Sequence, residues 1–171
     1  RLESSRLPNK PLADINGEPM IVHVFNRARE ANIANVIVAA GNIEIKDVIE
    51  NVGGEAILTK SDHASGSDRI YEALNLYDKD SSYDNVINLQ GDLPNIKKDA
   101  LTKIVSLLDS SNSDISTLGV KISSDQEILN PNIVKAYIKN LSENNIVDDF
   151  DRSFDLSKKD FLYHHIGIYG Y

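Results

Sequence analysis

Hydrophobic positions along the chain follow two alternating spacings, one typical of helices and one typical of strands. Apolar residues recur three or four positions apart, as on one face of a helix, in residues 19–32, 45–52, 70–77 and 101–108. Short extended runs lie between and after these segments, at residues 35–40, 55–59, 85–90 and 114–120. The regular exchange of helix and strand predicts an α/β domain with a mainly parallel sheet.

This alternation stops after residue 120. A turn signal, Asn130-Pro131-Asn132, precedes an extended run at residues 133–138. Residues 141–160 are polar, with six acidic and three basic side chains, and they predict a loop or an insertion. Residues 162–171 mix aromatic residues, isoleucine and glycine, a composition that predicts a last strand.

The two ends of the chain do not complete this pattern. The chain opens with a basic segment, described below, that suits a phosphate-binding loop. In doubly wound folds such a loop leaves the carboxyl end of a strand, so we expect a strand upstream of Arg1. The last predicted strand stops at Tyr171 without a turn or a cap. We therefore expect one domain, residues 1–171, that is truncated at both ends.

Length and composition agree with a single domain that has no broad polyanion-binding surface. The chain has 171 residues, of which 41% are apolar and 26% charged, enough for one well-packed core. A net charge of -8 argues against general binding to nucleic acid or to an anionic membrane. Cysteine is absent, which excludes disulfides and thiolate metal sites, and no apolar run reaches the roughly 20 residues of a membrane helix. We expect a cytoplasmic protein.

The first ten residues concentrate positive charge in an otherwise acidic chain. Arg1, Arg6 and Lys10 supply three cations, and Ser4 and Ser5 supply neutral hydrogen-bond donors between them. Cations with hydroxyl and amide donors at this spacing suit a polyphosphate such as a nucleoside triphosphate. The alternative is a solvated basic tail, which is common at N-termini.

A second polar motif, Gln90-Gly91-Asp92-Leu93-Pro94, follows the predicted strand at residues 85–90. Ligands collect at the carboxyl ends of strands in open α/β sheets, and a carboxylate preceded by glycine can face a bound ion. Asp92 is therefore a candidate ligand of Mg2+ bridging phosphate oxygens. The alternative is an ordinary turn, since Gly-Asp and Leu-Pro are common turn dipeptides.

Two further motifs carry candidate binding residues. In residues 61–69, Ser67 or Asp68 could cap the following helix, and Arg69 in its first turn could bind a carboxylate. His63, in the same segment, is typical of a solvent-exposed loop residue. In the last strand, His164 and His165 are adjacent and should face opposite ways, so we expect at most one of them in a shared pocket.

Taken together and in order, these motifs resemble those of the CMP-Kdo synthetases, the 3-deoxy-manno-octulosonate cytidylyltransferases of bacterial lipopolysaccharide synthesis. The resemblance spans nearly the whole chain. It rests on Arg-x-x-Ser-x-Arg-Leu-Pro-x-Lys-Pro-Leu at residues 1–12, Ile-x-Gly-x-Pro-Met-Ile at 15–21, Asp-His-x-Ser-Gly-x-Asp-Arg at 62–69, Gln-Gly-Asp-x-Pro at 90–94, Asn-Pro-Asn-x-Val-Lys at 130–135 and His-Ile-Gly-Ile-Tyr-Gly-Tyr at 165–171.

The resemblance implies a fold, a reaction and a dimer. The fold would be a Rossmann-like, glycosyltransferase-A-like nucleotidyltransferase, a three-layer sandwich whose sugar-binding and dimer-forming region includes about residues 121–171. The reaction would be transfer of a cytidylyl group from CTP to 3-deoxy-D-manno-octulosonate (Kdo), with Mg2+ as cofactor. The protein would work as a homodimer.

The resemblance also assigns roles to individual residues. The nucleotide would be bound by Arg1, Ser4, Arg6 and Lys10. Catalysis would involve Arg6, Lys10 and Asp92, the last as the metal ligand. Kdo would be bound by Arg69, Gln90, His165 and Tyr169.

Some positions depart from the family pattern, and two alternative functions stay open. The family usually has Thr-Asp where this chain has Ala40-Gly41, and glutamate at the position of Leu93. Asp149 and Asp151 add two acids near the expected sugar-binding region. One alternative is a related cytidylyltransferase for sialic acid or another acid sugar. The other is a non-catalytic, nucleotide-binding paralogue.

Overall fold

The computed structural model describes residues 9–110, 113–141 and 145–171, and its first part is built around two parallel strands. A 3-10 turn, η1 (Lys10–Leu12), leads into a small antiparallel hairpin of β1 (Asp14–Ile15) and β2 (Glu18–Pro19). The turn of this hairpin places Asn16 and Gly17 at positive φ, which suits these two residue types. The hairpin delivers the chain directly to the first long helix.

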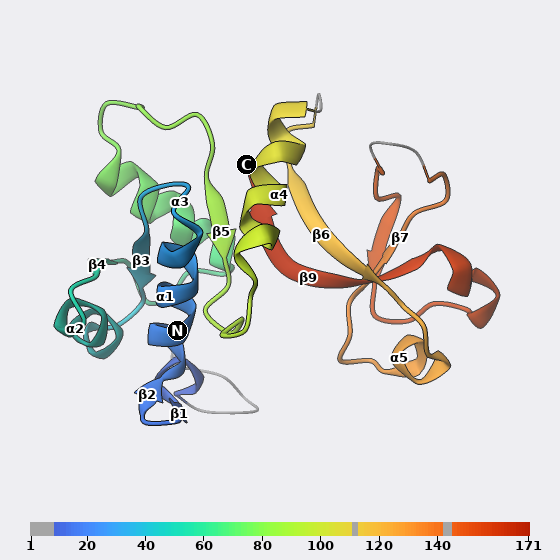
Figure 1. The fold of residues 1–171 in the computed structure, drawn as a ribbon, viewed down its shortest axis with the longest axis horizontal. Helices are drawn as coiled ribbons and strands as arrows, with labels where there is room; N and C mark the ends of the chain where they lie inside the picture. The colour runs from blue at the N-terminus through green and yellow to red at the C-terminus, as the bar shows by residue number, and fades with distance from the viewer. Residues whose placement is uncertain (1–8, 111–112, 142–144) are drawn as a thin grey trace.

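Alternating helices and strands follow the hairpin. Figure 1 shows α1 and α2 beside the parallel pair of β3 and β4. These elements, with the next helix, are α1 (Met20–Ala31), β3 (Ile37–Ala40), α2 (Ile43–Asn51), β4 (Glu55–Leu58) and α3 (Gly66–Tyr77).

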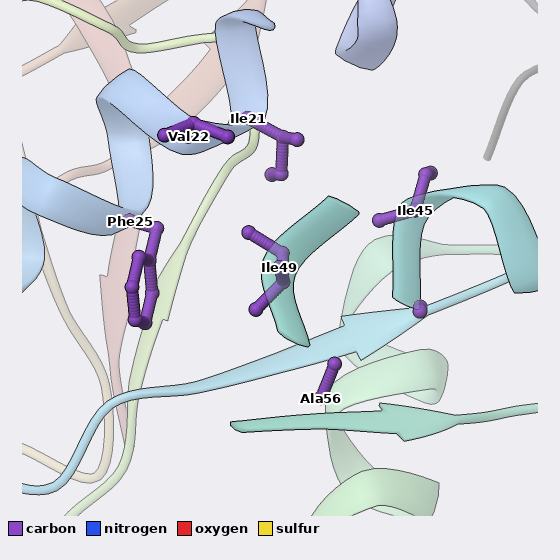
Figure 2. Packing of buried hydrophobic residues seen from close by; sticks show 7 residues of the cluster. Ile21, Val22, Phe25, Ile45, Ile49 and Ala56 are labelled. Atoms are coloured by element: carbon purple, nitrogen blue, oxygen red, sulfur yellow. The ribbon is translucent and has the colours of Figure 1, made fainter. Parts of the chain in front are cut away.

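The core of this part lies between α1, α2 and the strand pair. Figure 2 shows Phe25 of α1, Ile49 of α2 and Ala56 of β4 converging on one apolar layer. Gly54, which follows α2, lies tightly against this layer: a Cβ there would be 2.6 Å from atoms of both Ile49 and Phe25, so no larger residue fits. The helical spacing read from the sequence therefore corresponds to real buried faces.

Helix α3 begins at Gly66, earlier than the sequence indicated. Its N-cap is Ser65, whose hydroxyl accepts from the backbone N–H of Asp68, while the Asp68 carboxylate accepts from the backbone N–H of Ser65. The expectation that Ser67 or Asp68 is the cap was wrong, because Asp68 is the third residue of a capping box instead. The capping box thereby fixes the first turn of α3, which contains Gly66 and Ser67.

The second part of the chain contains a five-stranded sheet with helices beside it. Helix α4 packs against both β6 and β9, and Leu101, Ile104 and Ile168 form a second buried cluster there. The elements are β5 (Ile87–Leu89), α4 (Lys98–Ser110), β6 (Ser116–Lys121), α5 (Asp125–Leu129), β7 (Lys135–Tyr137), β8 (Asp149–Asp151), η2 (Leu156–Phe161) and β9 (Leu162–Gly170).

Strand β9 is the long central strand of this sheet, as the red ribbon in Figure 1 shows. Along one edge it pairs with β6 over most of its length. Along the other edge its first residues pair with β7 and its last residues with β5, the register placing Lys135 opposite His164 and Leu89 opposite Ile168. The ends of β5 and β7 therefore separate at the middle of β9.

The α/β class expected from the sequence is confirmed, but the strand pairing is less parallel than expected. Only β3 and β4 pair in parallel among the described residues, and β9 runs antiparallel to β5, β6 and β7. Hydrophobic spacing identifies a strand without giving its direction, which explains the difference. Within the described ranges, no helix is long and apolar enough to cross a membrane.

The polar segment at residues 141–160 is only partly a loop. Its described part includes β8 and the 3-10 helix η2. Helix α5, which precedes this segment, was not predicted from the sequence pattern. Residues in β8 are all exposed, so this edge strand shows none of the inside–outside alternation by which strands are recognised. Helix α5 is five residues long, too short to display a helical period.

Candidate functional site

A cleft of about 1020 Å³ opens where β5 and β7 separate along β9. The start of α3 and the loop after β5 form one wall, and β8 with the segments that precede β7 and β8 forms the other. Positions of the first wall are Ser65, Gly66, Ser67, Gln90 and Asp92; those of β9 are His164, His165, Gly167 and Tyr169; those of the far wall include Asn132, Phe150 and Arg152. The divergence of two strands on one edge of β9 thus creates the site.

Lys10 forms an ion pair with Asp92, one of the residues that line this cleft. The Lys10 Nζ donates to Asp92 Oδ2 at 2.8 Å, although 82 residues separate the two positions in the sequence. Both side chains stay partly exposed, at 36% and 49%, so they remain accessible to a ligand. The predicted cation and the predicted metal ligand are therefore together.

Arg1, Ser4 and Arg6 lie outside the described residues. Their assignment to the nucleotide stays a prediction.

Gln90 is held against the first turn of α3 by a chain of hydrogen bonds. Its Nε2 donates to Asn88 Oδ1 at 3.0 Å, and Asn88, only 2% exposed, donates from Nδ2 to Ser67 Oγ at 3.4 Å. Ser67 Oγ in turn lies 2.7 Å from the hydroxyl of Tyr171. Gly66 makes room for this arrangement, because a Cβ there would lie 3.1 Å from Gln90 Nε2.

His165 and Tyr169 border the cleft from β9, with their rings in contact. The ring centroids are 5.3 Å apart, and the ring of Phe150 meets His165 edge-on at 4.9 Å. Burial lowers the pKa of His165, helped by the neighbouring His164, so the imidazole is neutral at neutral pH. Burial raises the pKa of Tyr169, which keeps its phenol protonated.

His164 also borders the cleft, so the expectation that only one of the two histidines would reach it was wrong. Their partners nevertheless lie on different elements. His165 Nε2 is 2.9 Å from Thr117 Oγ1 on β6, whereas His164 Nδ1 is 3.6 Å from Glu127 Oε1 on α5. The two side chains therefore face different elements, as alternation along a strand predicts.

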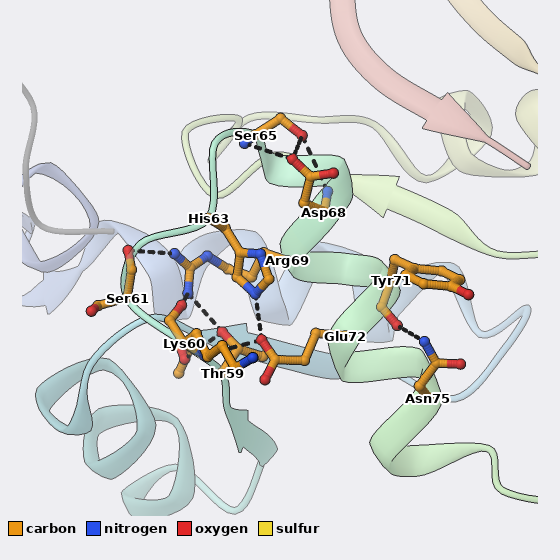
Figure 3. A network of polar contacts seen from close by, with 11 residues as sticks. Thr59, Lys60, Ser61, His63, Ser65, Asp68, Arg69, Tyr71, Glu72 and Asn75 are labelled. Atoms are coloured by element: carbon orange, nitrogen blue, oxygen red, sulfur yellow. Dashed lines mark hydrogen bonds and ion pairs between the residues drawn. The ribbon is translucent and has the colours of Figure 1, made fainter.

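The structure does not bring Arg69 to the wall of the cleft. Figure 3 shows its guanidinium pointing at the loop after β4, where Nη1 donates to Thr59 Oγ1 at 2.6 Å and to the Lys60 carbonyl at 2.9 Å. Nη2 donates to the Ser61 carbonyl at 3.3 Å, and only 7% of the residue is exposed. Arg69 thus fixes a loop; its contact with an acid sugar stays a prediction that this geometry does not support.

His63, expected to be a solvent-exposed loop residue, is instead tied to the same helix. Its Nε2 is paired with Glu72 Oε2, and Glu72 also accepts from the backbone N–H of Lys60. The hydrogen bond from His63 lowers the pKa of Glu72. Both contacts fasten the loop between β4 and α3, which carries Ser65 to the cleft.

Lys135 and Arg152 organise the far wall, and the residue patterns alone assigned them no role. Lys135 is fully buried, and its Nζ donates to the carbonyl of Asn130 at 2.6 Å and to that of Arg152. Arg152 Nη1 donates to the carbonyls of Pro131 and Asn132 at 3.3 and 3.1 Å. Lysine is rarely fully buried, so a lysine shortly after a turn signal is expected to be exposed, and no local sequence pattern indicated its burial.

These features define an α/β protein with a polar ligand cleft at the carboxyl end of β5, the usual position of nucleotide sites in such folds. The chain belongs to the cytidylyltransferase family, whose model matches residues 1–171.

Two curated relatives match the whole chain. A 3-deoxy-manno-octulosonate cytidylyltransferase of Brucella ovis is 47% identical over 173 residues, covering 100% of this chain and 69% of the relative. The enzyme of the same name from Brucella anthropi is 46% identical, covering 100% of this chain and 70% of the relative. The motifs read from the sequence therefore belong to the family they resembled.

Two solved structures share the fold. A CMP:2-keto-3-deoxy-manno-octonic acid synthetase complexed with CTP superposes with a TM-score of 0.84 at 35% identity, covering 99% of this chain and 70% of the other. A 4-diphosphocytidyl-2C-methyl-D-erythritol synthase from Anaerococcus prevotii has a TM-score of 0.60 at 13% identity, covering 94% of this chain and 65% of the other. The second likeness concerns the fold alone.

Proposed function

We propose that this protein transfers the cytidylyl group of CTP to Kdo, forming CMP-Kdo and pyrophosphate. The observation that carries the proposal is the pairing of Lys10 with Asp92 at one cleft that Gln90 and His165 also border. It is supported by the relatives named 3-deoxy-manno-octulosonate cytidylyltransferase and by the related synthetase complexed with CTP.

The chemistry requires charge neutralisation and alignment more than covalent catalysis. The anomeric hydroxyl oxygen of Kdo loses its proton to solvent and forms a bond to the α-phosphorus, and the bond from that phosphorus to the bridging oxygen breaks as pyrophosphate leaves. Lys10 is placed to neutralise charge on the phosphates, because its ammonium is paired with Asp92 on the cleft wall and is partly exposed. Arg1, Ser4 and Arg6 complete the proposed phosphate-binding loop.

Asp92 fits a magnesium site of the kind that nucleotides complete. Among the described residues no group of three or more His, Cys, Asp or Glu side chains could hold a metal, so the protein alone offers no closed site. Mg2+ commonly takes one or two carboxylates and draws its other ligands from phosphates and water, which matches a single half-exposed aspartate. Bound there, Mg2+ would supply positive charge to the phosphate oxygens. Lys10 holds the carboxylate in place meanwhile.

The sugar end of the cleft combines uncharged polar groups with a cation. Gln90, His165 and Tyr169 present an amide, an uncharged imidazole and a protonated phenol, which suit the hydroxyl groups of a sugar. Arg152, on the far wall, is a cation of that region. The proposed sugar is an acid, and a cation in the wall accommodates it.

We further propose where, in which pathway and in which oligomeric state the protein works. The protein would act in the cytoplasm, in lipopolysaccharide synthesis, as a homodimer. The homodimer rests on the resemblance to the CMP-Kdo synthetases.

A substrate panel tests the proposal. Pyrophosphate release by the purified protein would be measured with CTP and Mg2+ in the presence of Kdo, of sialic acid, or of no sugar, and with UTP or ATP replacing CTP. We expect release with CTP and Kdo only. Release with sialic acid and none with Kdo would assign the protein to the related cytidylyltransferases, and binding of both substrates without any release would make it a non-catalytic paralogue.

A further inference from the structure

The hydroxyl of Thr117 determines which nitrogen of His165 carries the proton. Thr117 Oγ1 donates to the carbonyl of Ile168 at 2.6 Å, and a carbonyl can only accept. Since a threonine hydroxyl has one proton, the same oxygen must accept at its second contact, 2.9 Å from His165 Nε2. His165 is therefore the donor in that contact, with its proton on Nε2.

A bulge in β9 makes this double contact possible. Thr117 pairs with Tyr169, but the next residue of β6, Leu118, pairs with Ile166, so two residues of β9 have no partner on β6. The carbonyl of Ile168 is thereby available to a side chain, and His165 is brought within reach of Thr117. Bulges of this kind re-aim side chains and recur beside functional sites.

The surroundings hold the ring in its neutral form and in a fixed orientation. Phe150 meets the imidazole edge-on at 4.9 Å and Tyr169 lies against it at 5.3 Å. Burial and the nearby His164 lower the pKa of His165, so the ring has one N–H and one acceptor nitrogen at neutral pH. With the proton on Nε2, the acceptor is Nδ1.

We propose that Thr117 is a positioning residue that fixes His165 as the Nε2-protonated tautomer, so that Nδ1 accepts a hydrogen bond from a hydroxyl group of the sugar in the cleft. The identity of that sugar rests on the proposed function. An acceptor nitrogen favours a hydroxyl and disfavours a carboxylate, because two acceptors repel. The pair therefore selects the orientation in which the acid group of the sugar points away from His165.

Nitrogen-15 NMR of the histidine rings tests the tautomer without any substrate. The His165 signals are assigned by their loss in H165Q, and long-range proton couplings show which nitrogen is protonated. We expect an Nε2-protonated ring in the wild type and in T117S, which keeps the hydroxyl, and a mixed or Nδ1-protonated ring in T117V. A wild-type ring protonated on Nδ1, or an unchanged ring in T117V, would overturn the inference.

Kinetics then test the role in binding. We expect T117V to raise the KM for Kdo about tenfold, the loss of one buried hydrogen bond, with the KM for CTP unchanged and T117S close to wild type. T102V serves as the control, since Thr102 is exposed on α4 and should leave both values unchanged. If T117V raised both KM values equally, the residue would be structural only.

The two proposals can fail separately. A wild-type protein with the Nε2 tautomer but no activity toward Kdo would contradict the proposed function and leave the tautomer assignment standing. An active wild type whose T117V variant keeps the same tautomer and the same KM for Kdo would contradict the role of Thr117 alone. Circular dichroism of each variant separates a local effect from unfolding.

Discussion

Gly41 lies directly against the guanidinium of Arg69: a Cβ at residue 41 would be 2.5 Å from Arg69 Nη1 and 2.8 Å from Cζ. The absence of a side chain at the end of β3 therefore leaves space for a buried arginine from α3. Where the family usually has Thr-Asp, this chain has Ala40-Gly41, and the glycine is what makes room for Arg69. The arginine uses the space to reach the loop after β4.

G41A should consequently displace Arg69 and loosen that loop. Overpacking of a tight site costs about 1–3 kcal/mol, and we expect a loss of that size in the free energy of unfolding, measured by urea titration. R69K in the same background should recover part of the loss, because the lysine head is narrower. Fully additive costs of the two substitutions would show that the two positions do not interact.

Substitution of Lys10 or Asp92 should remove activity while leaving stability nearly unchanged. The pair is partly exposed, and such ion pairs contribute about 0–1 kcal/mol to folding. We expect K10M and D92N to lower kcat/KM by about a hundredfold or more, the scale of losing one transition-state charge contact. E30Q, which breaks the exposed pair Arg27–Glu30, is the matched control and should leave kcat/KM intact.

A second outcome would contradict the proposed roles of Lys10 and Asp92. If D92N kept full pyrophosphate release at limiting Mg2+, the carboxylate would hold neither the metal nor the lysine in its working position.

Asn88 should hold the side chain of Gln90 in the position from which it binds the sugar. Its amide is 2% exposed and joins Gln90 to Ser67, so N88A leaves two polar partners without their hydrogen bonds. We expect a loss of about 1–3 kcal/mol in the free energy of unfolding and a higher KM for Kdo. N75A, on the exposed face of α3, provides the comparison, since Asn75 bonds only its own helix in the described contacts. An unchanged KM in N88A, with the stability loss present, would make Asn88 purely structural.

His165 should make stability dependent on pH below about 6.5. Its pKa is lower in the folded state than the ordinary 6.5, because burial disfavours the charged ring. As the pH falls below 6.5 the unfolded chain binds a proton first, so stability decreases until the pH passes below the folded pKa, where the loss levels off.

Urea titrations between pH 5 and pH 8 measure this dependence. The difference in unfolding free energy between wild type and H165Q should be constant above about pH 7 and should change below 6.5, with wild type losing more stability. Parallel curves over the whole range would show that His165 titrates alike in both states.

The sequence predicted most helices and strands because their buried faces are long enough to show a period. Helix α1 and the strands β3 and β4 fall close to their expected limits. Strand direction could not be predicted, since β9 joins β5 and β7 through contacts distant in sequence. Exposed or short elements such as β8 and α5 were missed because they bury no regular face.

The candidate site divides in the same way. Motif order brought out Asp92, Gln90 and His165, all of which border the cleft. Arg69 occurs in a motif of the same kind, yet the structure uses it to hold a loop, and a charged residue type alone does not distinguish the two uses. Thr117, whose importance depends on a bulge, has no sequence signal at all.

Direct observation of the product tests the central claim. Phosphorus-31 NMR of the purified protein with CTP, Kdo and Mg2+ should show a phosphodiester signal of CMP-Kdo and an equal amount of pyrophosphate, growing together at the expense of CTP. Neither signal should appear without Kdo. Loss of CTP without the phosphodiester, or a phosphodiester formed with sialic acid and not with Kdo, would contradict the assignment.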